Sequence, residues 1–202
     1  MSPRVSIALF LTAAFALGAI VLAANSRGGE DAPSSQFEGA IMPAGVRAPD
    51  FSLRNQDGEP VSMRALRGRP VAVTFLYTRC EETCPIQAQT LRGALDELGH
   101  DVPALAVSVD PPRDTAESAR AFLAEQRAGG RIDFVLGSRA ELRRVWEGFF
   151  IQPQTITREH QARFTLVDAR GFQRVGYPAE QATPERLAHD LRLLEAEADP
   201  GG

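Results

Sequence analysis

The chain contains no lysine, so arginine carries all of its positive side-chain charge. Its basic residues number 22 and its acidic residues 26, which gives a formal net charge of −4, and no stripe of basic and aromatic residues is present. A nucleic-acid-binding surface needs clustered positive charge. The composition therefore argues against a nucleic-acid partner. We attach no function to the absence of lysine.

Internal repeats are also absent, and cysteine and histidine are scarce, with two and three residues respectively. Hydrophobic residues make up 44% of the chain and charged residues 24%, which are ordinary values for a globular protein. A chain of 202 residues can form one domain with a sizeable core.

The one long hydrophobic run extends from Val5 to Ala24 and carries no charge. At about 1.5 Å per residue, this run can span the hydrocarbon core of a bilayer. We expect residues 1–24 to form an N-terminal transmembrane anchor. Leu22–Ala24 offers a small-residue cleavage site, but the run is longer than a typical cleaved signal needs. Arg4 is expected to stay inside, which places the rest of the chain on the exported, periplasmic or extracytoplasmic side.

Residues 25–45 are rich in Gly, Ser, Pro, Ala and acidic residues and show no apolar period. This composition predicts a flexible linker between the membrane and a domain at residues 46–198. Within that domain, apolar runs and capping residues predict an alternation of strands and helices. The alternation indicates an α/β fold with a mixed sheet and helices on both of its faces. The expected strands are 47–53, 61–63, 71–76, 102–109, 132–136, 162–167 and 172–176, and the expected helices begin near 85, 116, 139 and 183.

The only two cysteines, Cys80 and Cys84, lie between the strand 71–76 and a helix that Pro85 opens. The amides at a helix N-terminus favour thiolate over thiol, as does Arg79, whereas the adjacent glutamates oppose this effect. Two thiolates one turn apart can form a disulfide or bind one soft metal ion. A purely structural disulfide would close a very short loop and restrict the unfolded chain little.

A cysteine pair at the end of the first core strand is the thioredoxin-like arrangement, although three residues separate these cysteines instead of the usual two. In an oxidising compartment such a pair is oxidised unless a partner reduces it or a metal holds it.

A third ligand would suit both copper(I) and copper(II), because a soft thiolate pair binds copper(II) poorly on its own. His100 at a helix end and His189 on the last helix are expected at the surface. His160 precedes the strand 162–167, in a loop that faces the cysteine turn in a thioredoxin-like fold. On this pattern alone, a surface role for His160 stays open.

Three motifs together resemble the SCO/SenC family of membrane-anchored copper chaperones for cytochrome c oxidase assembly. They are the strand with Cys80-x-x-x-Cys84-Pro, the run Val107–Thr115, and a histidine before Phe164–Asp168. The resemblance implies a thioredoxin-like fold over about 49–194. It also implies that Cys80, Cys84 and His160 bind copper, with Asp110 either supporting the site or capping the loop that follows it. Arg79 and Gln161 depart from residues that are frequent in the family.

The function implied is a metallochaperone, not an enzyme, that passes copper(I) or copper(II) to an oxidase subunit carrying a copper site. Other copper chaperones or thiol reductants would be further partners. The alternative is a membrane-tethered thiol–disulfide oxidoreductase that keeps the client's copper-ligand cysteines reduced. In that case Cys80 would attack and Cys84 would resolve the mixed disulfide. A peroxidase and a structural zinc site fit less well, because the peroxidase motif and a fourth zinc ligand are lacking.

Overall fold

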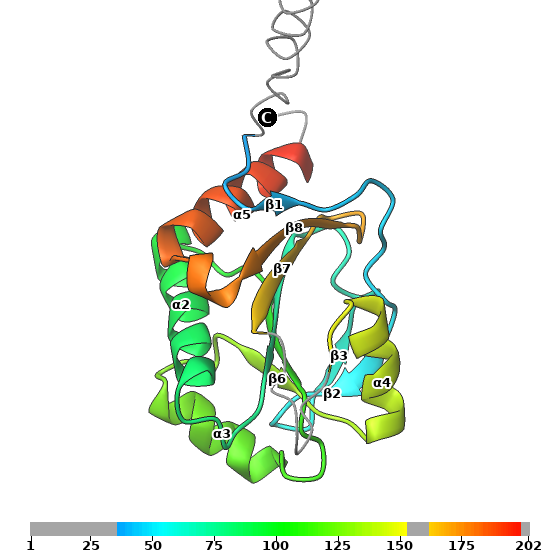
Figure 1. Ribbon diagram of the computed structural model, residues 1–202, viewed down its shortest axis with the longest axis vertical. Coiled ribbons are helices and arrows are strands. Elements are labelled where there is room, and N and C mark those ends of the chain that lie inside the picture. Colours follow the sequence, from blue (N-terminus) through cyan, green and yellow to red (C-terminus); the bar gives the residue numbers. More distant parts are fainter. Residues whose placement is uncertain (1–35, 153–161, 199–202) are drawn as a thin grey trace, which may run out of the picture. The chain divides into compact units, whose positions relative to one another are not determined.

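The computed structural model describes residues 36–152 and 162–198. A six-stranded mixed sheet forms the centre of this part of the chain (Figure 1). The strand order is β1-β8-β7-β4-β5-β6, and a separate two-stranded hairpin consists of β2 and β3. The strands are β1 (Ala40–Ile41), β2 (Ser52–Arg54), β3 (Pro60–Ser62), β4 (Val71–Leu76), β5 (Ala104–Ser108), β6 (Asp133–Val135), β7 (Arg163–Val167) and β8 (Gln173–Pro178).

Strand β4 occupies the middle of the sheet, and all six of its residues are buried. It pairs in parallel with β5 and antiparallel with β7, while β6 extends the parallel half beyond β5. A strand buried on both faces needs apolar residues at every position instead of an alternation. The run Val71–Leu76 is apolar except for Thr74, whose hydroxyl donates to the carbonyl of Arg163 and accepts a hydrogen bond from the side chain of Gln87.

Helices cover both faces of the sheet (Figure 1). α2 (Thr83–Leu98), α3 (Ala116–Glu125) and α5 (Pro184–Ala198) lie on one face, and α4 (Arg139–Gly148) lies on the other with the hairpin β2-β3. Side chains of β4 alternate between the two cores: Leu76 packs toward α2, and Phe75 contacts Phe149 beside α4 with ring centroids 5.5 Å apart. The predicted α/β architecture is confirmed.

Two helices begin at side-chain caps that the sequence contains. Thr115 accepts a hydrogen bond from the Ser118 amide at α3, and Ser138 accepts one from the Glu141 amide at α4. Both are reciprocal capping boxes, which satisfy amides that the first helical turn leaves unpaired. α2 ends at Gly99, whose φ of 75° lies in the left-handed region that glycine adopts at low cost.

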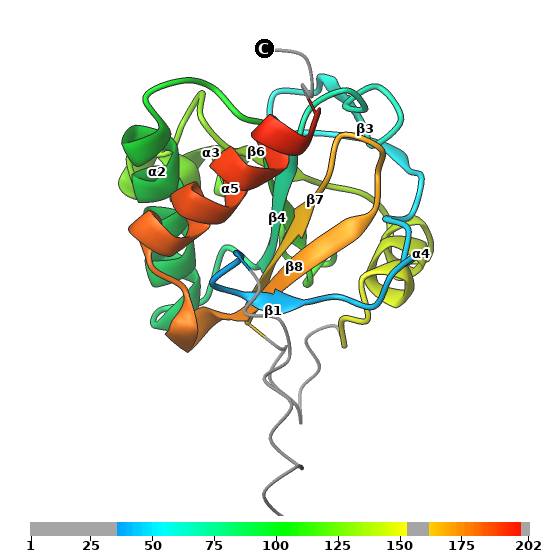
Figure 2. The same cartoon turned by 90° about the horizontal axis from the view of Figure 1, so that it is seen from above.

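The segment before the first predicted strand is docked on the domain. β1 pairs with β8 at the edge of the sheet (Figure 2), and the fully buried carboxylate of Asp190 on α5 accepts hydrogen bonds from the amides of Glu38 and Gly39 at 2.9 and 3.0 Å. The expectation of a flexible linker up to residue 45 is therefore wrong for this part. Pairing of the backbone with β8 and Asp190 offsets the lack of an apolar period there.

The predicted strands and helices are otherwise found within a few residues of their expected bounds. The strand expected at 47–53 is reduced to Ser52–Arg54, and α2 begins at Thr83 instead of Pro85. No helix within 36–152 and 162–198 is long and apolar enough to cross a membrane. The predicted anchor, residues 1–24, lies outside these ranges.

Candidate metal centre

The two cysteines lie where β4 passes into α2. Cys84 belongs to the first turn of α2, and Cys80 lies in the short loop between β4 and that helix. A hydrogen bond of 3.3 Å from the Cys80 amide to the carbonyl of Tyr77 closes a turn in this loop. Because β4 and β5 run in parallel, the loop that follows β5 begins at the same end of the sheet as the cysteine loop that follows β4. The backbone thus positions the cysteine pair beside the segment 109–115.

The thiols of Cys80 and Cys84 are free and not joined in a disulfide. Cys80 Sγ accepts a hydrogen bond from the Cys84 amide at 3.2 Å and lies 3.4 Å from the hydroxyl oxygen of Thr83. Cys80 is 9% exposed, whereas Cys84 is fully buried. Only Cys80 is therefore open to a reagent or partner from solvent.

The two thiols differ in acidity as well as in exposure. Burial acts to raise the pKa of Cys80, but hydrogen bonds from Cys84, Thr83 and backbone amides outweigh it, and the pKa is lowered. Burial raises the pKa of Cys84, and its hydrogen bond with Cys80 raises it further. Since the thiolate is both nucleophile and metal ligand, Cys80 is the first of the pair to become reactive.

A pocket of about 390 Å³ opens beside Cys80. Its wall includes Arg79 and two glutamates of the cysteine loop. It also includes Ala162, the residue immediately before β7, which is the strand that pairs with β4. This pocket gives an incoming ion or side chain access to the exposed sulfur. Its lining residues are Tyr77, Arg79, Cys80, Glu81, Glu82, Thr83 and Ala162.

Asp114 also belongs to this region, although its residue type and its place two residues before α3 are typical of a helix cap. Its buried carboxylate accepts hydrogen bonds from the amide and hydroxyl of Thr78, at 2.9 and 2.8 Å, and from the hydroxyl of Ser108 at 2.5 Å. Thr115, not Asp114, caps α3. Asp114 could have been identified from its place after β5, since the ends of neighbouring parallel strands lie side by side.

Asp110, predicted to support the site or to cap its loop, is buried and forms an ion pair with Arg113 at 2.5 Å. Its backbone carbonyl accepts hydrogen bonds from the amides of Arg113 and Asp114, which closes a turn at the start of the loop. Within the described part of the chain, no hydrogen bond joins Asp110 to either cysteine. A supporting role at a metal site stays a prediction.

Two of the three histidines lie away from the cysteines. His100 is exposed and pairs with Glu195 at 2.7 Å, and this hydrogen bond raises the pKa of His100. His189 is partly exposed and contacts the buried Asp190 at 2.9 Å. His160 lies outside the described residues. Within 36–152 and 162–198, no group of three His, Cys, Asp or Glu side chains is arranged to hold a metal ion.

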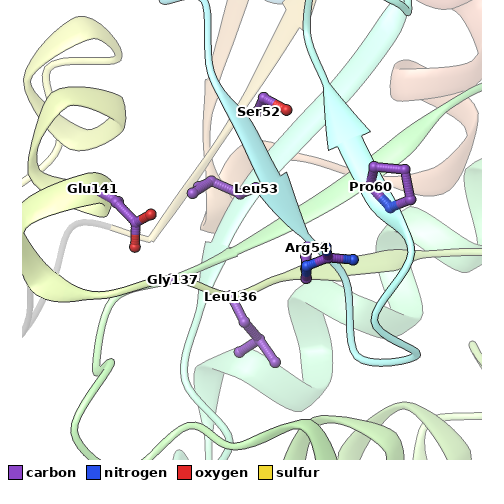
Figure 3. Close-up of a pocket in the computed structure, with 7 residues that line it drawn as sticks. All are labelled: Ser52, Leu53, Arg54, Pro60, Leu136, Gly137 and Glu141. Carbon is purple, nitrogen blue, oxygen red and sulfur yellow. The ribbon is translucent and has the colours of Figure 1, made fainter.

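A second pocket, of about 420 Å³, lies between the hairpin β2-β3 and the start of α4. Figure 3 shows the side chain of Leu53 from β2 pointing toward Glu141, while Arg54 and Leu136, whose backbones are hydrogen-bonded, lie beside them. The Glu141 carboxylate accepts hydrogen bonds from Ser138 in the α4 capping box. The residues that line this pocket include no cysteine or histidine, so we place the candidate site at Cys80.

Known proteins share both the sequence pattern and the fold. A model of the SCO1/SenC family matches residues 42–195. SenC of Rhodobacter capsulatus is 38% identical over 164 residues, which cover 75% of this chain and 72% of SenC. The copper-bound structure of Bradyrhizobium japonicum ScoI is 26% identical, with a TM-score of 0.60, covering 73% of this chain and 99% of that one.

The structure of BsSco, described as a member of the Sco family of cytochrome c oxidase assembly proteins with a disulfide switch, is 26% identical. Its TM-score is 0.67, and the match covers 78% of this chain and 98% of that one.

A mixed sheet whose central strand leads into a cysteine pair at a helix N-terminus defines a thioredoxin-like protein. Within that class, the three-residue spacing of Cys80 and Cys84 and the family-model match over residues 42–195 identify the family. The chain belongs to the SCO1/SenC family, which is known for copper binding and cytochrome c oxidase assembly.

Proposed function

We propose that this protein binds one copper ion through Cys80, Cys84 and His160 and delivers it to a respiratory cytochrome c oxidase during assembly. The observation that carries the proposal is the pair of free thiols at the N-terminus of α2, one beside an open pocket. Copper(I) prefers soft thiolate ligands, and an added imidazole extends the ligand set to copper(II).

The position of Ala162 supports His160 as the third ligand. Ala162 lines the pocket at Cys80 and follows His160 by two residues in the sequence. Two residues of chain span at most about 7 Å. Position 160 is therefore separated by at most about 7 Å of chain from a residue that lines this pocket.

The relatives support copper as the ion. ScoI of Bradyrhizobium japonicum has been solved with copper bound, and so has ScoI of Arabidopsis thaliana, which shares the fold. A relative from Stutzerimonas stutzeri that matches 44% of this chain is named a putative copper-binding protein.

Delivery requires that copper leave as readily as it enters. Cys80, which is 9% exposed and lines the pocket, is suited to ligand exchange, because an incoming thiolate of the client can reach the metal from the pocket side. The buried Cys84 then remains as the last protein ligand. We further propose that residues 1–24 anchor the domain on the exported face of the membrane, which would keep it close to a membrane-embedded client.

The alternative function, a thiol–disulfide oxidoreductase, uses the same two thiols but has no need of His160. A His160→Ala variant should therefore lose tight copper(II) binding while it retains thiol–disulfide exchange with a model disulfide. Equal copper(II) binding by the wild type and His160→Ala, combined with rapid disulfide reduction, would favour the oxidoreductase.

Transfer tests the chaperone role itself. The copper-loaded chain is mixed with the metal-free copper-binding domain of an oxidase subunit, and copper in each protein is measured after separation. We expect copper to move to the client domain from the wild type. Copper that stays on this chain in the presence of excess metal-free client would contradict the delivery role.

A further inference from the structure

The carboxylate of Asp114 is hydrogen-bonded to Thr78 of the cysteine loop, and Thr78 lies inside the turn that ends at Cys80. The turn runs from Tyr77 to Cys80 and is closed by the amide of Cys80 and the carbonyl of Tyr77. Thr78 is its second residue. Both polar groups of Thr78 that can donate, its amide and its hydroxyl, donate to Oδ1 of Asp114.

The other oxygen of Asp114 is bound to the scaffold. Oδ2 accepts the hydroxyl proton of Ser108, the last residue of β5, and β5 pairs with β4 in register up to Leu76 and Ser108. The carboxylate therefore joins the cysteine turn to the rigid centre of the sheet. Asp114 is 7% exposed, so water competes little for these hydrogen bonds.

We propose that Asp114 is a positioning residue for the copper site, because its carboxylate ties the turn that presents Cys80 to the end of β5. This inference rests on the proposed function. It assigns Asp114 no contact with the metal, and Asp114 acts only through Thr78. A ligand sulfur must be held in place for a fixed coordination geometry, and outer residues that hold ligands commonly change metal affinity when they are lost.

Two substitutions at this position separate geometry from charge. Asn in place of Asp114 keeps Oδ1 as the acceptor for Thr78, and its amide group can donate to the hydroxyl of Ser108, which has two lone pairs. Ala removes both links, which leaves the Thr78 amide without its partner and the Thr78 hydroxyl with Ser118 Oγ, 3.3 Å away. Asp190→Ala is the matched control, since it removes another buried carboxylate, which binds the amides of residues 38 and 39 instead of the cysteine loop.

The test uses the full chain, residues 1–202, purified in detergent. Copper(II) affinity and the thiolate-to-copper absorption band are measured for the wild type and for the three variants. Hydrogen exchange at the amides of residues 78–80 is followed in the metal-free proteins. We expect Asp114→Ala to bind copper at least about tenfold more weakly, with a shifted band and faster exchange at Thr78. Asp114→Asn should restore all three values toward the wild type, and Asp190→Ala should leave them unchanged.

The outcomes distinguish this inference from the proposed function. A wild type that binds no copper overturns the function. A wild type that binds copper, together with an Asp114→Ala variant that has the same affinity, band and exchange rates, overturns only the role of Asp114. A change of the same size in Asp190→Ala also overturns it, because general destabilisation would then explain the effect.

Discussion

The amide of Cys84 donates a hydrogen bond to the sulfur of Cys80 at 3.2 Å, so one cysteine stabilises the thiolate of the other. The donor comes from the first turn of α2, where amides lack partners within the helix. The acceptor sulfur is the more exposed of the two. This relationship makes the pair unequal before any metal binds.

The inequality predicts selective alkylation. In the reduced, metal-free protein, iodoacetamide near neutral pH should modify Cys80 at least about tenfold faster than Cys84, because thiolate fraction and access both favour Cys80. Fragment ions of the peptide that contains both cysteines distinguish the two positions. Equal rates, or faster modification of Cys84, would contradict the assignment of Cys80 as the reactive thiol.

The buried Asp114 predicts a pH-dependent stability. Burial raises its pKa above the ordinary value of 3.8, even though hydrogen bonds from Ser108 and Thr78 oppose the shift. The folded state then holds this proton more tightly than the unfolded state, so the contribution of Asp114 to stability falls as pH rises from about 3.8 through the raised pKa.

The measurement is the difference in unfolding free energy between the wild type and Asp114→Asn, obtained from denaturant titrations at several pH values from about 3.5 to 7. Asn does not ionise in this range, so the wild type should lose stability relative to the variant as pH rises. If the wild type instead gained stability relative to Asp114→Asn as pH rises, the folded protein would lower the pKa of Asp114.

The docking of the segment before β2 predicts that a methyl group added at Gly39 lowers the stability of the protein. A Cβ on Gly39 would lie 2.4 Å from Val175 and 2.5 Å from Tyr177, whereas a Cβ on Gly129 would meet nothing within 4 Å. We expect Gly39→Ala to lower the free energy of unfolding by about 1–3 kcal/mol. Gly129→Ala should change it by less than about 1 kcal/mol. Equal effects in chemical denaturation would argue against docking of this segment.

The proposed membrane anchor at residues 1–24 is tested by fractionation. The chain 1–202 should sediment with membranes and require detergent for release, because residues 5–24 are uncharged and almost wholly apolar. Deletion of residues 1–24 should move the protein to the aqueous fraction. A mature protein whose sequence starts after Ala24 would instead identify this run as a cleaved signal.

The sequence was most informative where one local rule decides the structure. The largely apolar, partly β-branched run 71–76 predicts a buried strand, and Ser138 with Glu141 three residues later defines the start of α4. The cysteines were identified by their spacing and by their place between strand and helix. These features depend on neighbours in sequence, so periodicity and capping reveal them.

Features that depend on distant partners were missed. Glu38 and Gly39 lie in a segment with linker composition, and only α5, about 150 residues away, supplies the carboxylate that holds them. Asp114 has the composition of a helix cap, yet its carboxylate binds a loop 36 residues earlier. Tertiary pairing decides both cases: no pattern within either segment reveals it, and only the order of the parallel strands points to Asp114.

The measurement that tests the central claim most directly is an anaerobic copper titration of the reduced full chain, with Cys80→Ser, Cys84→Ser and His160→Ala beside the wild type. We predict one copper per wild-type chain and, for copper(II), a thiolate charge-transfer band that each substitution weakens. A wild type that binds copper no more tightly than the three variants would contradict the account.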